Sequence, residues 1–397
     1  MKADNLIKKA VILAAGEGQR LRPFTASKPK PMISIAGKPI LQYVVEALAQ
    51  NGVREITMVV GYKKEAIFDF FGSGEDFGVE IEYTIQPQQL GTGHALRQTK
   101  GKIRGEFLVL SGDNIIEPKT ISKLVHIPPH AILLKRQEEI SKYGIATVDD
   151  GNLTGLLEKP EKPLTDLVNT GIYSFTEEVF NFLDEELDLP GIIQNMLSSS
   201  KKIRAIETPG IWLDAVYPWD ILRLNDLVLS RLSPRQSGTI ERGVVIKGPV
   251  SIGKGTVIRA NSYIVGPVII GEGCEIGPSV SIFPSTEIGS HSVIFPYSEI
   301  RNSVLGEGVK VGTGSTIRDS IIDRYSQLGA HFSTISGEAR IEIEGEHHQV
   351  TIGAMIGEHC RIGDGVALAP GVIIGNKVRI GVLKSVDKNI PDETWVM

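Results

Sequence analysis

The sequence has few cysteines and no long apolar stretch. Only Cys274 and Cys360 occur among 397 residues, and they lie far apart, which argues against a disulfide framework and favours a reducing compartment. No apolar run approaches the roughly 18 to 20 residues that a membrane span needs, and the charged segment 1–10 lacks the apolar core of a signal peptide. We therefore expect a cytoplasmic protein without a membrane partner.

An excess of positive charge is also missing. The chain has 42 Lys and Arg against 47 Asp and Glu, a net charge of −5, so no nucleic-acid partner is indicated. Its 41% hydrophobic and 22% charged residues are ordinary for a globular protein, and its length predicts two to three domains. If such a protein handles polyphosphates, its basic residues have to be gathered locally.

The first half alternates short apolar runs with longer amphipathic stretches. This alternation predicts an α/β, Rossmann-like domain with a mostly parallel sheet covered by helices on both faces. Such sheets bind ligands beyond the carboxyl ends of their strands. The expected strands are 10–14, 55–60, 80–85 and 107–110, and the expected helices are 40–50, 65–71 and 92–98.

The second half carries a six-residue repeat of isoleucine. The period fits neither a helix nor an amphipathic strand and is typical of a hexapeptide β-helix, in which the isoleucines stack inside a triangular coil. The phase shifts by one residue at Leu305 and at Ile322, breaks over 337–350, which we interpret as a loop or hairpin, and resumes at Ile356. The first repeats are Ile240, Ile246, Ile252, Ile258, Ile264, Ile270, Ile276, Ile282, Ile288, Ile294 and Ile300.

These two patterns predict two domains in series. A helix is expected over 218–232, and the Ser, Pro, Arg and Gly of 233–238 indicate a linker. We predict a nucleotide-handling α/β domain over 1–232 and a left-handed parallel β-helix over 238–397.

A glycine turn follows the first expected strand. Gly16 and Gly18 come directly after it, and such a turn lets backbone amides approach phosphate oxygens. Alone, the pattern would favour a tight strand-to-helix turn. The residues that follow favour a triphosphate site, because four cations lie on a segment stiffened by prolines: Arg20, Arg22, Lys28 and Lys30, with Pro29 and Pro31.

Residues 13–32 read LAAGEGQRLRPFTASKPKPM. This segment resembles the signature L-A-A-G-x-G-T-R-L-x-P-x-T-x-x-x-P-K-x-M of the sugar-1-phosphate nucleotidylyltransferases, with Gln19 where Thr is usual. The resemblance spans nearly the whole chain. It is strongest to archaeal two-domain enzymes related to bifunctional N-acetylglucosamine-1-phosphate uridylyltransferase and to glucose-1-phosphate thymidylyltransferase. It implies an enzyme that joins a sugar 1-phosphate to a nucleoside triphosphate and releases pyrophosphate.

The resemblance assigns roles on the nucleotide side. It implies that Arg20 holds the β- and γ-phosphates, that Lys30 bridges phosphates at the reacting centre, and that Gln86 bonds the base. His94 has a simpler explanation as packing at a helix start, and we give it no catalytic role. The implied nucleotide-binding residues are Ala14, Ala15, Gly16, Gln86, Gly91 and Thr92.

Two aspartates are candidate ligands of Mg²⁺. Asp113 stands in the Gly-Asp turn that follows the buried run 107–110. A carboxylate at this end of a strand faces the ligand crevice. Hard oxygen ligands of this kind suit Mg²⁺. Alone, Asp113 could serve as a turn or cap residue. Asp214, in Gly-Ile-Trp-Leu-Asp, resembles the G-x-W-x-D of the family, which implies that both aspartates hold the metal.

Other motifs resemble the sugar side of the family's site. Glu158-Lys159-Pro160 matches its E-K-P, which implies that Glu158 accepts hydrogen bonds from sugar hydroxyls and that Lys159 contacts the sugar phosphate as a catalytic cation. Gly144 and Asn169 match further sugar-binding positions. Without this context, a Glu-Lys pair would be read as ordinary surface charge.

Sequence details favour some nucleotides and sugar phosphates over others, but they leave more than one substrate open. Leu-Ala-Ala-Gly and Gln86 favour UTP or dTTP over GTP, because guanine-using relatives often carry Gly where Ala15 lies. The segment Gln-Leu-Gly-Thr-Gly-His-Ala favours N-acetylglucosamine 1-phosphate, and glucose 1-phosphate stays as an alternative.

The β-helix raises the question of a second activity. Such domains often form trimers, and many transfer acetyl groups from acetyl-CoA, using a base and an Asn within G-A-G-T-I-x-x-N. Here 328–336 contains no Asn, and 312–316 contains no His, so His331, His347 and His348 are left as possible bases. A lone histidine in a coil or loop is more often structural.

Three hypotheses follow. The first is a nucleotidylyltransferase whose β-helix assembles a homo-oligomer, a trimer or a multiple of it. The second adds acetylation of glucosamine 1-phosphate from acetyl-CoA. The third is a non-catalytic regulatory homologue, against which the retention of the predicted cationic and metal-binding residues argues.

Overall fold

A computed structural model describes residues 6–138, 140, 142–158, 160, 165–183 and 186–397. Their contacts divide the chain into two compact units. The first unit contains 1–17, 28–32 and 39–214, and the second contains 18–27, 33–38 and 215–397. The helix α6 (Asp220–Leu229) groups with the second unit, whereas the boundary at 232–238 stays a prediction.

The first unit is built on a nine-stranded sheet. Its strands β5, β4, β1 and β6 are mutually parallel, which confirms the four strands expected from the apolar runs. Beyond β6 the sheet is mixed, because β11 runs antiparallel to both β6 and β8. The order is β5 (Glu80–Ile85), β4 (Glu55–Val60), β1 (Lys9–Ala14), β6 (Glu106–Ser111), β11 (Leu167–Thr176), β8 (Ala131–Arg136), β12 (Arg204–Glu207), β10 (Asn152–Leu157) and β9 (Ile145–Asp149).

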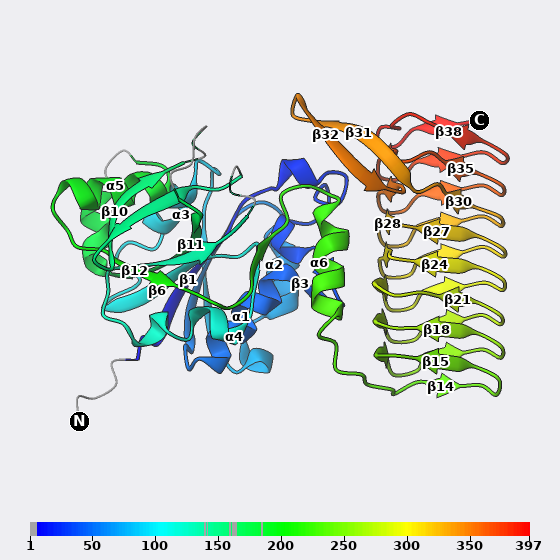
Figure 1. The fold of residues 1–397 in the computed structure, drawn as a ribbon, viewed down its shortest axis with the longest axis horizontal. Helices are drawn as coiled ribbons and strands as arrows, with labels where there is room; N and C mark the ends of the chain where they lie inside the picture. Colours follow the sequence, from blue (N-terminus) through cyan, green and yellow to red (C-terminus); the bar gives the residue numbers. More distant parts are fainter. Residues whose placement is uncertain (1–5, 139, 141, 159, 161–164, 184–185) are drawn as a thin grey trace. The chain divides into compact units, whose positions relative to one another are not determined.

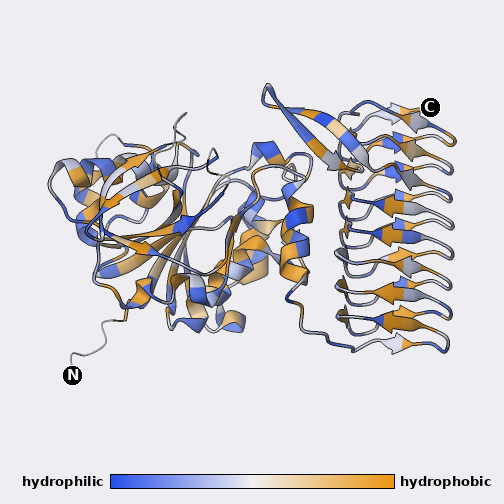
Figure 2. Cartoon of the chain, in the orientation of Figure 1, coloured by the Kyte–Doolittle hydropathy of each residue, from blue (hydrophilic) through white to orange (hydrophobic). Residues whose placement is uncertain are grey.

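Two apolar clusters cover the two faces of this sheet. Ile12 of β1 packs in one cluster with Leu41 of α1, and its neighbour Val11 packs in the other with Leu96 of α3. Successive side chains of a strand point to opposite faces, so a strand buried on both faces reads as an unbroken apolar run, and Figure 2 shows the strands of this unit as largely hydrophobic. The helices are α1 (Ile40–Gln50), α2 (Glu65–Phe71), α3 (Thr92–Arg97), α4 (Pro118–Ile121) and α5 (Leu189–Ser198), with 3-10 turns η2 (Lys30–Met32), η3 (Glu75–Phe77), η4 (Leu124–His126) and η5 (Glu177–Phe182).

A short antiparallel pair completes the first unit. Strand β13 (Trp212–Asp214) pairs with β7 (Asn114–Ile116), and Asp214 lies opposite Asn114. The pairing joins segments that are distant in sequence and brings Asp214 beside the end of β6.

The second unit is a left-handed parallel β-helix with three sheets, and each coil adds one strand to each sheet (Figure 1). Ile258, Ile276 and Ile294 lie one above another in register and are fully buried, which confirms the stacked isoleucines. The β14 sheet contains β14 (Thr239–Ile240), β17 (Val257–Ile258), β20 (Glu275–Ile276), β23 (Val293–Ile294), β26 (Lys310–Val311), β29 (Gln327–Leu328), β34 (Arg361–Ile362), β37 (Arg379–Ile380) and β39 (Trp395–Val396).

The two other sheets have the same construction. The β15 sheet contains β15 (Val245–Lys247), β18 (Tyr263–Val265), β21 (Ser281–Ile282), β24 (Glu299–Arg301), β27 (Thr316–Arg318), β30 (Ser333–Thr334), β35 (Ala367–Leu368) and β38 (Ser385–Val386). The β16 sheet contains β16 (Val250–Ile252), β19 (Val268–Ile270), β22 (Thr286–Ile288), β25 (Val304–Leu305), β28 (Ile321–Ile322), β33 (Met355–Ile356) and β36 (Ile373–Ile374). Both cysteines are free and buried in the coil, and burial raises the pKa of Cys360 to about 11.

All the departures from the six-residue period fall at one corner, between the β15 sheet and the β16 sheet. The two one-residue shifts lie at the turns from β24 to β25 and from β27 to β28, where Asn302 and Asp319 adopt positive φ angles of 43° and 48°. The interruption lies at the same corner, between β30 and β33. It is a hairpin of β31 (Gly337–Ile343) and β32 (Glu346–Ile352) (Figure 1), which confirms the hairpin interpretation.

Segments from the first half of the sequence also belong to the second unit. They include η1 (Gln19–Leu21), β2 (Ser34–Ile35) and the first residue of β3 (Lys38–Pro39). The buried Asn225 of α6 accepts from the amide of Ala36 at 3.1 Å and donates to the carbonyl of Ser285 at 3.0 Å, so α6 ties 33–38 to the coil. No helix within the described ranges has the length and apolarity to cross a bilayer.

Candidate functional site in the first unit

The carboxyl ends of four parallel strands form the edge at which ligands were expected. Leu13 and Ser111 are partners in the β1–β6 register, and the amide of Gly112 donates to the carbonyl of Leu13 at 2.8 Å. The amide of Gln86 donates to the carbonyl of Val60, also at 2.8 Å. The structure therefore brings the ends of β1, β4, β5 and β6 to one edge of the sheet.

Lys30 lies between the two predicted metal ligands. Its Nζ is 2.6 Å from Oδ2 of Asp113 and 2.7 Å from Oδ1 of Asp214. Asp113 follows β6, Asp214 ends β13, and Lys30 begins η2, so the cluster joins three distant parts of the sequence. The Oγ of Ser111 donates to Asp113 Oδ1 at 2.5 Å, a contact that no sequence motif had indicated.

The electrostatics of this cluster favour the charged forms of Lys30 and Asp113. Burial opposes the charge on Lys30, but the carboxylates of Asp113 and Asp214 outweigh it and raise the pKa of the ammonium group. Burial acts against the charge on Asp113 as well, and the ammonium group of Lys30 overcomes it and lowers the pKa of that carboxyl. The first unit thus holds an ammonium group between carboxyl groups in a fixed arrangement that is largely shielded from solvent.

The donor set of this cluster fits a magnesium ion. Asp113 and Asp214 converge on one cation and offer hard carboxylate oxygens, with side-chain exposures of 29% and 20%. Mg²⁺ is usually held by one or two carboxylates, with phosphate oxygens and water completing its shell. No group of three His, Cys, Asp or Glu side chains suited to a metal occurs among the described residues, so phosphate and water would supply the other ligands.

The predicted phosphate-binding backbone lies at the same edge. Ala14 and Ala15 are buried, whereas a Cβ built on Gly16 would meet nothing within 4 Å. At Gly112 a Cβ would lie 3.0 Å from the Cβ of Ala14, so that position has no room for a side chain. The open space above Gly16 is therefore a place where a ligand can approach the main chain.

Gln86 is engaged within the protein. It is 3% exposed, and its Nε2 donates to the carbonyl of Gly91 at 3.1 Å and lies 2.9 Å from Nδ1 of His94. Thr92 is held by Asp188, whose Oδ1 accepts from the Thr92 amide at 3.1 Å. Asp188 precedes α5 and matches no local motif, so only the tertiary fold reveals its role in fixing this turn.

The structure brings three predicted sugar-binding residues together. A Cβ on Gly144 would lie 2.6 Å from Oε2 of Glu158, and the Asn169 amide donates to the Gly144 carbonyl at 2.8 Å. Asn169 Nδ2 also donates to the hydroxyl of Tyr173 at 2.7 Å, where burial raises the tyrosine pKa. Lys159, the third predicted catalytic cation, lies outside the described residues.

Trp212 lies in the same Gly-Ile-Trp-Leu-Asp segment as Asp214, but the motif assigned no role to it. It is buried, and its ring meets that of Tyr143 edge-on with centroids 5.1 Å apart. Its Nε1 has no hydrogen-bond partner in the described part of the chain. Because Trp212 begins the strand that Asp214 ends, its packing helps to place that carboxylate.

Arg20 belongs to the second unit. Its Nε lies 2.6 Å from Oε2 of Glu344, at the turn of the β31–β32 hairpin, and the two side chains are 43% and 47% exposed. The hydrogen bond that Arg20 donates to Glu344 raises the pKa of the guanidinium group. The cation that was predicted to hold phosphates is thus paired with a carboxylate.

The possible bases of the β-helix do not gather at one place. His331 is exposed at a corner with a φ of 56°, and His347 is exposed on β32. His348 packs against the rings of Tyr217 and Trp219, with centroids 4.3 Å and 5.3 Å away. This packing is a structural role for the last of the three.

The family model described as nucleotidyl transferase matches residues 9–230, and that described as GMPPB C-terminal domain matches 264–351. The chain therefore belongs to the nucleotidyl transferase family. Within it, the chain belongs with the sugar-1-phosphate nucleotidylyltransferases, and relatives that match it over nearly the whole length are described as bifunctional.

One such relative is the bifunctional protein GlmU of Methanococcus maripaludis, 36% identical over 98% of this chain and 96% of that protein. Another is the bifunctional sugar-1-phosphate nucleotidylyltransferase/acetyltransferase of Sulfurisphaera tokodaii, 34% identical over 94% of this chain and 95% of that protein. A solved structure described as a glucose-1-phosphate thymidylyltransferase of Bacillus anthracis, in complex with sucrose, is 27% identical. It covers 55% of this chain and 94% of its own, with a TM-score of 0.52.

Proposed function

We propose that this protein transfers a nucleotidyl group from UTP or dTTP to N-acetylglucosamine 1-phosphate or glucose 1-phosphate, with Mg²⁺, and releases pyrophosphate. The observation that carries the proposal is the cluster of Lys30, Asp113 and Asp214. A cation held between two carboxylates, beside an open glycine turn, suits a reaction between phosphates.

The chemical difficulty of this reaction is the approach of two anions. The phosphate oxygen of the sugar forms a bond to the α-phosphorus while the bond from that phosphorus to the pyrophosphate oxygen breaks. The attacking oxygen is already anionic, so no general base is needed. Lys30, Arg20 and Lys159 offset the repulsion and stabilise charge on the α-phosphate, so catalysis rests on positioning and electrostatics.

Each side of the site has residues for its substrate. Ala14, Ala15 and Gly16 offer main-chain groups to the nucleotide, and Glu158 and Asn169 offer acceptors and donors to the sugar. Asp113 and Asp214 would hold Mg²⁺, which when bound neutralises phosphate charge as a Lewis acid.

The substrate assignment is tested by measuring pyrophosphate release with four nucleoside triphosphates crossed with four sugar 1-phosphates. The sugars are glucose, N-acetylglucosamine, glucosamine and mannose. We expect the highest kcat/KM with UTP or dTTP and with N-acetylglucosamine or glucose 1-phosphate. Preference for GTP and mannose 1-phosphate would overturn the substrate assignment, and no release from any pair would overturn the reaction.

The metal assignment is tested by Asp113→Asn and Asp214→Asn, which keep the side-chain shape. Each variant should lose about 10²- to 10³-fold in kcat, the usual effect of losing one preorganised charge, and should need more Mg²⁺ for half-maximal rate. Asp149→Asn, at an exposed position at the end of β9, is the control and should behave as wild type. An enzyme that keeps its full rate in EDTA contradicts the metal assignment.

Acetyl transfer is a second candidate function. The Sulfurisphaera tokodaii relative is described as an acetyltransferase as well, and the similarity extends through the β-helix. A groove of about 460 Å³ there is lined by Tyr325, Gln327, His359, Arg361, Lys377 and Arg379. Of these, Arg361, Lys377 and Arg379 are cations suited to the phosphates of acetyl-CoA. Release of free thiol from acetyl-CoA with glucosamine 1-phosphate supports this function, and its absence at high enzyme concentration rules it out.

Assembly into a homo-oligomer, a trimer or a multiple of it, is part of the proposal. Apolar side chains are exposed near the end of the β-helix, with exposures of 80% for Leu383 and 60% for Trp395. Light scattering of the purified protein measures the assembly, and a monomeric mass would contradict it.

A further inference from the structure

The segment 18–27, here called the signature loop, has little regular structure of its own. It carries Arg20, and its one helical turn is η1. Its other internal support in the described structure is a set of turn hydrogen bonds, such as that from Thr25 Oγ1 to the Gly18 carbonyl at 2.9 Å. The chain continues from Ser27 through Lys28 to Lys30 within three residues. The conformation of this loop therefore depends on what it contacts.

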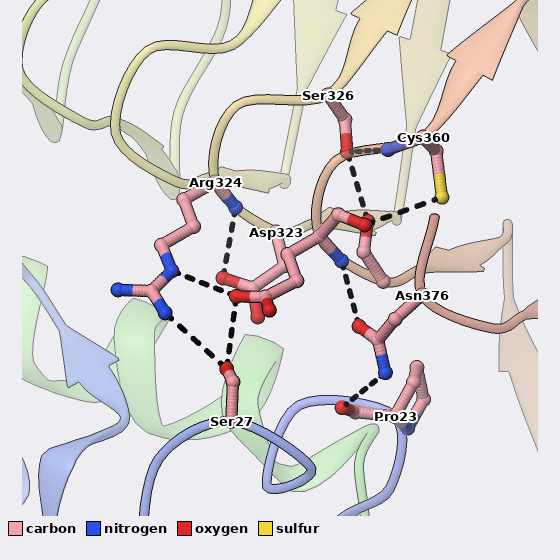
Figure 3. Close-up of polar contacts among 9 residues, drawn as sticks. Pro23, Ser27, Asp323, Arg324, Ser326, Cys360 and Asn376 are labelled. Carbon is pink, nitrogen blue, oxygen red and sulfur yellow. Dashed lines mark hydrogen bonds and ion pairs between the residues drawn. The ribbon is translucent and has the colours of Figure 1, made fainter. Parts of the chain in front are cut away.

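Side chains of the second unit make those contacts. Besides Glu344, which pairs with Arg20, three of them lie in the coil. Ser27 Oγ donates to Oε2 of Glu358 at 2.8 Å and accepts from Nη2 of Arg324 at 3.3 Å (Figure 3). Arg324 Nε donates to the same carboxylate oxygen at 2.7 Å. Asn376 Nδ2 donates to the carbonyl of Pro23 at 3.2 Å.

These side chains occupy equivalent positions in consecutive coils. Each lies at the corner between the β16 sheet and the β14 sheet, two residues after the isoleucine that ends a strand of the β16 sheet. In earlier coils the same position is exposed at Lys254, Glu272 and Glu307 and half-buried at Ser290. Glu358 and Asn376 are each 6% exposed. The corner is thus buried at Glu358 and Asn376, which contact the signature loop, whereas the side chain of Arg324 stays 37% exposed.

Hydrogen bonds also fix the backbone at Glu358. Its amide donates to Oδ1 of Asn376 at 2.9 Å, so the two loop-binding residues are linked. Ser326 Oγ donates to the Gly357 carbonyl at 2.8 Å and accepts from the Cys360 amide at 3.1 Å, which fixes the turn on both sides of Glu358 (Figure 3). Hydrogen bonds to a charged, desolvated group are stronger than those between neutral groups.

A β-helix does not need these contacts for its own core. The stacked isoleucines form that core in every coil, and the corner position tolerates exposed Lys or Glu where no loop is present. A buried carboxylate that binds Arg324 and Ser27 together therefore has its clearest use in holding the loop.

We infer that Glu358, with Arg324 and Asn376, positions the signature loop for nucleotidyl transfer, so that the β-helix contributes to the reaction without touching substrate. The inference rests on the proposed function. Glu358 fixes Ser27, Asn376 fixes Pro23, and the loop between Gly18 and these anchors presents Arg20. When an anchor is lost, Arg20 keeps its charge, but the loop that carries it can adopt many conformations.

The test is a double-mutant cycle of Ser27→Ala and Glu358→Gln, measured as kcat and KM for nucleotide and sugar phosphate. Each single variant should lower kcat/KM for the nucleotide about tenfold, as expected for one hydrogen bond to a charged group, with little change in KM for the sugar phosphate. The double variant should lose no more than the worse single variant, because both remove the same contact. Ser27→Thr, which keeps the hydroxyl, should restore the rate.

Glu299→Gln is the matched control. It removes another glutamate–arginine pair of the coil, in which Glu299 Oε1 lies 2.9 Å from Nη2 of Arg318, and it should leave both KM values unchanged. Wild-type kinetics in both single variants, or losses that multiply in the double variant, overturn the inference. So does a loss of rate explained entirely by unfolded protein in a thermal melt.

Hydrogen exchange separates this inference from the proposed function. In Glu358→Gln the amides of 19–27 should exchange faster than in wild type, while those of the stacked strands should not change. This readout needs no catalysis, so an inactive wild type overturns the proposed function alone. Unchanged exchange of 19–27 overturns the anchoring.

Discussion

The two units hold their buried charges in different ways. In the first, Lys30, Asp113 and Asp214 come from three separated segments that an irregular sheet brings together. In the second, Arg324, Glu358 and Asn376 lie one coil apart at a single corner of a regular repeat. A non-repetitive α/β domain places a site where its strands end, whereas a repeat places one where its members differ from their neighbours.

This difference also decides how each region can be changed. The α/β unit concentrates the charges of its site at one edge of the sheet, so one substitution there should change the rate of the reaction. The β-helix spreads its stability over equivalent layers, so a core substitution acts on folding, and the special positions are the corner and the hairpin. The following predictions test whether that division is correct.

The largest effect is expected at Lys30. Lys30→Met keeps most of the side-chain stem but removes the ammonium group, so pyrophosphate release should fall by about 10²- to 10³-fold. Lys100→Met, at an exposed position, should behave as wild type. A Lys30→Met enzyme with near-normal kcat would sink the assignment of the charged cluster to catalysis.

Substitutions in the core of the β-helix should lower the free energy of unfolding. Ile276 is fully buried in the stack, and Ile276→Ala should lower the free energy of unfolding by about 2 to 5 kcal/mol, because it leaves a cavity. Leu383 is 80% exposed, and Leu383→Ala should change it by less than about 0.5 kcal/mol. Denaturant unfolding followed by circular dichroism measures both. Equal effects would show that the stack does not carry the stability of the coil.

A smaller effect is expected where the hairpin meets Arg20. In Glu344→Gln the guanidinium group loses its carboxylate partner and becomes available to phosphate. Because exposed ion pairs contribute about 0 to 1 kcal/mol, the KM for the nucleotide should fall by no more than about fivefold. Glu342→Gln, on β31 of the same hairpin, is the control. A raised KM in Glu344→Gln would show that Glu344 helps to hold Arg20 for the nucleotide.

The smallest effect concerns pH and the first unit. Burial lowers the pKa of His130, against the opposing carboxylate of Glu178, so the folded state favours the neutral imidazole. Stability from this group is complete above the ordinary histidine pKa of about 6.5 and is lost as pH falls through the lower folded value. Melting temperatures at pH 7.5 and 5.5 should therefore differ less in His130→Gln than in wild type.

The exposed His347 provides the comparison for that measurement. His347→Gln should show the wild-type difference between the two pH values. If His347→Gln and His130→Gln behave alike, the pH dependence does not arise from the buried imidazole.

Much of the fold followed from local patterns. The runs that became β1, β4 and β5 are apolar or alternate, and the isoleucine period marked the coil and even its two one-residue shifts. The strands β8, β11 and β12 were not predicted, because their neighbours in the sheet lie far apart in sequence. The motifs likewise indicated Asp113 and Asp214, but Asp188 acts through a contact with Thr92 that no local segment encodes.

The sequence by itself determined the architecture and the chemical class of the site residues, because hydrophobic periodicity and a long signature are properties of neighbouring residues. Only the tertiary structure decided that Lys30 lies between two carboxylates, that Arg20 pairs with Glu344, and that Glu358 becomes buried where its counterparts in earlier coils are exposed. These facts depend on segments that lie from about 80 to more than 300 residues apart, whose contacts form only when the chain has folded.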